Sequence, residues 1–258
     1  QVAPLREKVL QKLREGVKEA RVNDMKSLVA LGKIQGDAQI TQTLFDLTEQ
    51  RLKARGRIQK STALFIDKSG SMQICVDIGK QLAALVSTVC EAELYVEVFD
   101  GQSFTIAPES RSLAGWEQAF RFVRADGCTS IGCSLNKLKD TRLEQIVVVS
   151  DGEENTAPFF SLELKEYRDR HGFVPQLFLI KVSEREETDF ERMVASEGFS
   201  MSVIPFRGDY YNLPNIVPRL CQGRESDVVH EVLQYQIYTR TDLDCLPLGF
   251  NAETCEIL

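Results

Sequence analysis

The sequence predicts an α/β fold, a doubly wound and mostly parallel sheet of about six strands flanked by helices. From residue 61 onward, short apolar runs rich in β-branched residues alternate with longer stretches of helical periodicity. This alternation is typical of a parallel sheet wrapped by helices. Two of the runs, 146–149 and 177–180, are continuously apolar, as expected for strands that are buried on both faces. Together these features predict a Rossmann-like core.

The strands and helices of this core can be placed along the chain. The segments predicted as strands are 62–67, 94–99, 103–106, 144–150, 176–182 and 200–206. Helical patterns lie near 73–91, 115–124, 132–139, 158–171, 186–197 and 210–221. Because segment 103–106 follows so closely on 94–99, we expect these two strands to form a hairpin at one edge of the sheet.

The two ends of the chain differ from this core. Residues 1–60 are predicted to be helical, since Leu5, Val9, Leu13 and Val17 recur every four residues. Near the other end, apolar and polar residues alternate over 233–239, which favours a strand with one wet face, and 242–258 is predicted to be irregular or a docked tail. The expected organisation is therefore a helical segment 1–60, an α/β domain 61–222 and a C-terminal extension 223–258.

Charge is spread unevenly over the 258 residues, whose formal net charge is −7. Residues 1–60 hold 13 basic and 7 acidic side chains, whereas the rest of the chain holds 18 basic and 31 acidic ones. The acidic bulk argues against a large nucleic-acid surface in that part of the chain, so RNA is expected only as an indirect partner. The basic segment 1–60 is interpreted as solvated helix faces, with contact to an acidic partner or to phosphates as the alternative.

Other features bear on where the protein works. No stretch approaches the roughly 18 apolar residues of a membrane span, so no membrane partner is expected. The seven cysteines are odd in number and scattered, which favours a reducing, cytoplasmic location over a disulfide framework.

The segment Asp67-Lys68-Ser69-Gly70-Ser71 is the most informative part of the sequence. It directly follows the predicted strand 62–67 and precedes a long helical pattern. One carboxylate and two hydroxyls are therefore delivered to the carboxyl end of a parallel strand, the edge at which open α/β sheets bind ligands. Such oxygens suit Mg²⁺ or Mn²⁺ better than zinc or copper.

Two further segments supply oxygens in similar positions. Thr129 lies in the Gly-containing run 127–132 before a helical pattern, and Asp151 follows the buried strand 144–150. If the strands 62–67 and 144–150 are neighbours, all these groups meet at one edge of the sheet. The predicted metal ligands are Asp67, Ser69, Ser71, Thr129 and Asp151.

These residues resemble the metal-ion-dependent adhesion site of the von Willebrand factor A (VWA) domain family. That site consists of Asp-x-Ser-x-Ser, a Thr in a Gly-rich loop, and an Asp after a hydrophobic strand; here order and spacing agree over residues 61–221. The resemblance implies that Ser69, Ser71 and Thr129 bind the metal directly or through water, while Asp67 and Asp151 act largely through bound waters. The sequence departs from the family at Cys128, where a Gly often stands.

Within that family, residues 164–170 and the apolar strand after them are most similar to the VWA domain of the Ro autoantigen. Ro proteins carry a ring of helical repeats before this domain and bind RNA there. Residues 1–60 are too short to form such a ring.

The chemistry of the predicted site suggests a partner. Mg²⁺ requires six oxygens in near-octahedral geometry and keeps several waters, and Mn²⁺ or Ca²⁺ are alternatives. Three neutral hydroxyls with two outer carboxylates leave much of its charge uncompensated. We therefore expect an open position that binds a Glu or Asp of another protein, which makes the chain a non-enzymatic interaction or scaffold module.

Two other functions are considered. One is a Mg²⁺-dependent phosphatase-like hydrolase with Asp67 as nucleophile, which needs a second acid and a Lys to stabilise the transferred group. The other is a component of an RNA–protein complex resembling Ro. Among the remaining residues, Glu153 and Glu154 are interpreted as a capped, solvated turn, and the three aromatics Trp116, Phe120 and Phe122 as helix-packing residues.

Overall fold

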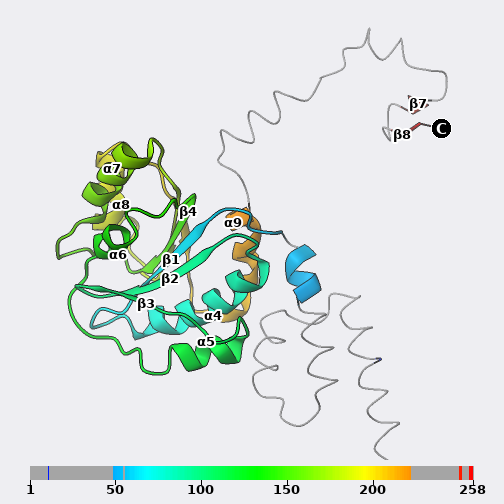
Figure 1. Ribbon diagram of the computed structural model, residues 1–258, viewed down its shortest axis with the longest axis horizontal. Helices are drawn as coiled ribbons and strands as arrows, with labels where there is room; N and C mark the ends of the chain where they lie inside the picture. The colour runs from blue at the N-terminus through cyan, green and yellow to red at the C-terminus, as the bar shows by residue number, and fades with distance from the viewer. Residues whose placement is uncertain (1–10, 12–48, 55, 222–249, 252–255, 258) are drawn as a thin grey trace, which may run out of the picture. The chain divides into compact units, whose positions relative to one another are not determined.

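The computed structural model describes residues 11, 49–54, 56–221, 250–251 and 256–257 (Figure 1). Contacts within the chain divide it into two units, Gln1–Cys221 and Gln222–Leu258. Apart from residue 11, the helices predicted within 1–48 lie outside the described residues, as does the strand predicted at 233–239.

The first unit contains the predicted sheet. Its strands are β1 (Thr62–Asp67), β2 (Leu94–Phe99), β3 (Ser103–Thr105), β4 (Gln145–Ser150), β5 (Gln176–Lys181) and β6 (Ser202–Pro205). They are arranged in the order β3-β2-β1-β4-β5-β6, and every pairing is parallel except that of β2 with β3. The predicted α/β class and the edge hairpin are confirmed.

The strand order reverses direction between β1 and β4, which are direct neighbours. The chain extends from β1 towards β3 on one side and from β4 towards β6 on the other. In open α/β sheets such a switch point opens a crevice at the carboxyl ends of the strands. The neighbouring strands that the metal-site prediction required are therefore confirmed.

Helices cover both faces of the sheet. They are α4 (Gln73–Val89), α5 (Leu113–Ala119), α6 (Gly132–Lys137), α7 (Phe160–His171), α8 (Asp189–Ser196), the 3₁₀ helix η1 (Tyr210–Ile216) and α9 (Val217–Cys221). Figure 1 shows α6, α7 and α8 on one side and α4, α5 and α9 on the other. Two separate apolar clusters fill the spaces beneath these two layers.

Strand β1 contributes to both clusters, because successive side chains of a strand point to opposite faces. Leu64 and Ile66 pack against α4, whereas Ala63 and Phe65 pack on the side of α6 and α7. On α4, Gly79 lies against Ile66 so closely that an added Cβ would come within 2.6 Å of its side chain. This contact brings the helix that follows Ser71 close to the strand that ends in Asp67.

Some boundaries differ from the predictions. Helix α5 begins at Leu113, where the Ser112 hydroxyl accepts a hydrogen bond from Gly115, and it ends at Ala119 rather than near residue 124. Phe122 consequently lies outside the helix and is 76% exposed, so its packing role was wrongly predicted. Segment 210–221 is divided into η1 and α9, and Pro214 lies inside η1. Proline has no backbone N–H to donate to a helical hydrogen bond, which disfavours one continuous α-helix over this segment.

In the second unit, β7 (Phe250–Asn251) and β8 (Glu256–Ile257) form a short antiparallel pair. Of the two alternatives for 242–258, an irregular segment is wrong for these four residues, and a docked tail stays a prediction. No helix among the residues described here is long and apolar enough to cross a membrane.

Candidate metal centre

Three loops meet at the carboxyl edge of the sheet, beside the switch point. The first leaves β1 at Asp67 and turns into α4, the second is 126–131 ahead of α6, and the third leaves β4 at Ser150 and continues to α7. Because β1 and β4 are paired in parallel, their carboxyl ends place the first and third loops side by side.

Asp67 occupies the centre of this arrangement and is 0% exposed. Its Oδ1 accepts a 2.8 Å hydrogen bond from the backbone N–H of Ser69, and its Oδ2 accepts a 2.6 Å bond from Oγ of Ser150. Burial raises the pKa of Asp67; these hydrogen bonds oppose the increase, and the nearby charge of Asp151 adds to it. A positive charge placed here would stabilise the ionised form of Asp67.

Backbone hydrogen bonds join the first loop to the second. The N–H of Gly70 donates to the carbonyl of Gly127 over 3.1 Å, and the N–H of Asp126 donates to the carbonyl of Lys68 over 2.7 Å. Gly127 has a φ of +89°, and a Cβ there would lie 3.1 Å from that of Asp100. The loop therefore has its required glycine one residue before Cys128, so a cysteine at position 128 does not remove that backbone freedom.

Thr129 connects the second loop to the third. Its backbone N–H donates to Oδ1 of Asn155 over 3.1 Å, and its carbonyl accepts from the N–H groups of Asn155 and Thr156. In the third loop, Oδ1 of Asp151 accepts a 3.0 Å bond from the N–H of Glu153. No local sequence pattern distinguishes Asn155 from other loop residues, so its role becomes visible only in the structure.

The five predicted ligands thus lie on three loops that are hydrogen-bonded or paired to one another. Asp67, Ser69 and Thr129 are buried, Asp151 is half-buried and Ser71 is exposed. Such a set offers two carboxylates and three hydroxyls, which are hard donors suited to Mg²⁺. Within the described part of the chain there is no group of three or more His, Cys, Asp or Glu side chains able to hold a metal, so the candidate centre depends on its hydroxyl oxygens.

Comparison with known proteins identifies the fold. No protein-family profile matches the sequence, and no curated protein matches it. Among solved structures, the Ro (RSR) protein of Deinococcus radiodurans aligns with 83% of this chain at 15% identity and a TM-score of 0.54. The chain shares the fold of the part of this Ro protein with which it aligns.

Two VWA structures show a weaker similarity. A von Willebrand factor type A protein from Catenulispora acidiphila aligns with 64% of this chain at 18% identity and a TM-score of 0.49. The SpRpn10 VWA domain aligns with 64% of this chain and 98% of its own length, at 13% identity and a TM-score of 0.41. The chain spans only 48% of the Ro protein and 42% of the Catenulispora protein.

Glu154 has a role that the sequence did not reveal. The predicted solvated turn is wrong for this residue, since Glu154 is only 7% exposed. Its carboxylate accepts hydrogen bonds from the backbone N–H of Gly132 at 2.9 Å and of Phe160 at 3.1 Å, at the beginnings of α6 and α7. Burial raises the pKa of Glu154 to about 7, although these N–H groups favour its charged form. The residue therefore fixes the loop that carries Thr129 relative to the one that carries Asp151.

Neighbouring charges at this edge are paired. The Lys68 ammonium forms an ion pair with Asp100 and lies 5.3 Å from the centre of the Phe104 ring. Burial alone would raise the pKa of Asp100, but the contacts with Lys68 and with backbone N–H groups lower it below its usual value. Glu153, unlike Glu154, forms an ion pair with Arg185 near the surface.

Proposed function

We propose that the chain binds Mg²⁺ at the carboxyl edge of the sheet and presents it to an acidic residue of a partner protein. Ser69, Ser71 and Thr129 would supply hydroxyl oxygens to the ion, and Asp67 and Asp151 would act mainly on its bound waters. Mn²⁺ or Ca²⁺ could take the same place, since both accept oxygen ligands.

The burial of Asp67 beside Asp151 is the observation that supports this proposal best. Asp67 is fully buried, and although two hydrogen bonds stabilise its ionised form, burial and the nearby charge of Asp151 still raise its pKa. The arrangement lies at the switch point between β1 and β4, where ligands bind in open sheets. A divalent cation would compensate both charges.

The donor set also favours an acidic partner. Hydroxyl ligands are neutral, so an ion held by them keeps most of its charge and attracts an anionic oxygen. The exposure of Ser71 and the partial exposure of Asp151 leave one side of the site open to solvent. Metal and partner would then bind cooperatively, because each completes the other's coordination and charge.

A hydrolase that uses Asp67 as nucleophile is less well supported. Both carboxylate oxygens of Asp67 already accept short hydrogen bonds inside the protein, and no face of the side chain is exposed. Lys68, which such an enzyme would need beside the phosphoryl group, is paired with Asp100 instead. An assay with an aryl phosphate, with and without Mg²⁺, would separate the two: turnover that disappears in Asp67→Asn would overturn the proposal.

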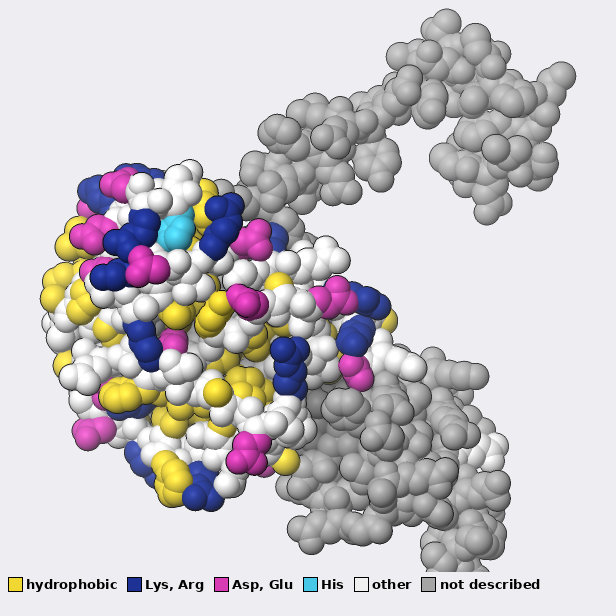
Figure 2. All heavy atoms as spheres, viewed as in Figure 1, with side chains coloured by type: hydrophobic (Ala, Val, Ile, Leu, Met, Phe, Trp, Pro, Cys, Tyr) yellow, Lys and Arg dark blue, Asp and Glu magenta, His cyan; other side chains and the backbone are white. Residues whose placement is uncertain are grey.

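The alternative of an RNA–protein component rests on the similarity to Ro, which shows the fold alone. On the face seen in Figure 2, Lys and Arg side chains are interspersed with Asp and Glu. That face offers no extended basic track for a phosphate backbone. Retention of RNA by the full chain, falling steeply with added salt, would favour this alternative.

The proposed interaction can be tested by affinity capture. The full chain, immobilised, is incubated with extract of its native cells in Mg²⁺ or in EDTA, next to the Asp151→Ala variant. We expect at least one protein to be retained by the wild-type chain in Mg²⁺ only, and a Glu or Asp of that protein to be essential for retention. The same proteins retained equally in EDTA and by the variant would contradict the proposal.

A further inference from the structure

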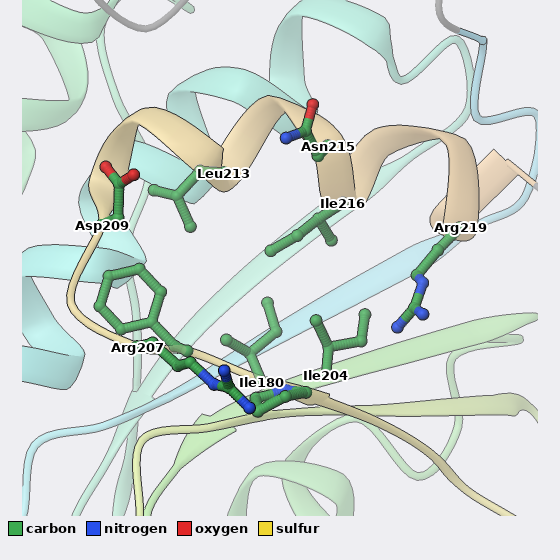
Figure 3. A pocket seen from close by; sticks show the side chains of 10 residues that line it. Ile180, Ile204, Arg207, Asp209, Leu213, Asn215, Ile216 and Arg219 are labelled. Atoms are coloured by element: carbon green, nitrogen blue, oxygen red, sulfur yellow. The ribbon is translucent and has the colours of Figure 1, made fainter.

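A cavity separate from the candidate metal centre lies at the β6 edge of the sheet, between strands β5 and β6 and the helical turns of η1 and α9. Its volume is about 390 Å³, and none of the five predicted metal ligands lines it. Figure 3 shows Ile180 of β5 and Ile204 of β6 on one side, facing Leu213 and Ile216 of η1 on the other. The Phe206 ring completes the wall and packs edge-on against Tyr210, with ring centres 5.2 Å apart.

The size and lining of this cavity are compatible with a ligand site. Protein interiors are packed as densely as organic crystals and leave few voids larger than a water molecule. Pockets for small molecules usually occupy about 300–1,000 Å³ and are mostly apolar, with a few polar groups that orient the ligand. The cavity falls in this range, and its floor is built from isoleucine and leucine side chains.

Two arginines provide the polar groups. In Figure 3, Arg207 and Arg219 lie at opposite sides of the cavity, with Ile180 and Ile204 between them. Both are exposed, and neither guanidinium forms an ion pair or hydrogen bond with another described residue. Asp209 also lines the cavity, but it already interacts with another group of the protein.

We propose that this cavity binds an amphipathic carboxylate of the fatty-acid type. The alkyl chain would lie among Ile204, Leu213 and Ile216, and the carboxylate would bind to Arg207 or Arg219. A guanidinium is suited to this because its planar fork can donate two parallel hydrogen bonds to one carboxylate. The apolar lining disfavours small hydrophilic anions, and the two positive charges disfavour apolar cations.

A titration of the full chain with a series of ligands tests the proposal. Hexanoate, octanoate, decanoate and decylamine are added below the concentrations at which they form micelles, and binding is measured by calorimetry. We expect affinity to increase about fourfold for each methylene until the cavity is filled, since each buried methylene contributes a fixed transfer free energy. Decylamine, which has the same chain and the opposite charge, should not bind.

Variants then locate the site. Arg219→Glu and Arg207→Glu should each weaken decanoate binding, and the one that holds the carboxylate should do so by about tenfold or more, as expected for a charge-assisted hydrogen bond. Arg111→Glu is the matched control, because Arg111 is exposed and does not line the cavity. Equal binding of decanoate and decylamine, equal loss in all three variants, or no decanoate binding to the wild-type chain would each overturn the proposal.

Discussion

The hydroxyl of Ser150 donates a 2.6 Å hydrogen bond to Oδ2 of Asp67, and so joins the carboxyl ends of β4 and β1. Both residues are completely buried. The same Ser150 oxygen also accepts a 3.0 Å bond from the N–H of Gly152, in the loop that carries Asp151. One hydroxyl therefore fixes both carboxylates of the candidate metal centre relative to the sheet.

Replacing Ser150 by alanine should destabilise the protein. Oδ2 of Asp67 would lose its partner, and a buried acceptor left unsatisfied costs about 1–3 kcal/mol. Urea unfolding at neutral pH measures this loss. The control is Ser196→Ala, which removes a hydroxyl at the exposed end of α8 and should change the free energy of unfolding by no more than about 0.5 kcal/mol. A similar small effect in Ser150→Ala would show that the bond contributes little.

Removing a predicted ligand should abolish Mg²⁺ binding and leave the fold intact. In wild type, Mg²⁺ at 100 times its dissociation constant should raise the free energy of unfolding by about 2.7 kcal/mol. Asp151→Ala and Ser69→Ala should lose this increase while melting near the temperature of the metal-free wild type. Asp140→Ala, which removes an exposed carboxylate paired with Arg170, should keep the full response. Collapse of either ligand variant without metal would show that the residues are structural.

Glu154 should make stability dependent on pH. Its pKa in the folded protein is about 7, above the usual value of 4.5, so the folded state binds more protons than the unfolded state between these values. Stability should therefore decrease as pH rises from about 4.5 to 7, by about 3 kcal/mol in total, and the contribution of Glu154 should be constant above that range.

Glu154→Gln tests this directly, because the amide keeps the shape of the side chain but cannot titrate. The free energy of unfolding of wild type minus that of the variant should decrease over the same pH range. Glu153→Gln is the matched control, since Glu153 is the adjacent residue and lies near the surface in an ion pair with Arg185. A difference between wild type and Glu154→Gln that does not vary with pH would refute the assignment.

Gly79 should tolerate no side chain. An alanine at an exposed helical position normally stabilises by up to about 1 kcal/mol relative to glycine, but here its Cβ would collide with Ile66. Such overpacking should instead cost about 1–3 kcal/mol. In a double-mutant cycle with Ile66→Ala, the two losses measured by chemical denaturation should add to more than that of the double variant. Strict additivity would indicate that the two residues do not interact.

The strands were the most predictable part of the fold. β1 and β2 begin and end at the predicted residues, because their runs of apolar and β-branched residues end at polar turns. Helix ends were less predictable, since they depend on individual caps: the Thr188 and Glu191 side chains start α8 three residues after the expected position. The exposure of Phe122 could not be read from its sequence neighbours, because it depends on where α5 ends.

The sequence by itself determined the class of fold and the fact that Asp67, Ser69 and Ser71 follow a strand, since strand periodicity and the spacing of these residues are local properties of the chain. The pairing of β1 with β4, which brings Asp151 to the same edge, was decided by the tertiary structure. Only the tertiary structure decided that Glu154 caps two helices, that Asn155 holds the Thr129 loop, and that an apolar cavity forms beneath η1. Those features depend on groups far apart in sequence that become neighbours only when strand pairing and helix packing bring them together.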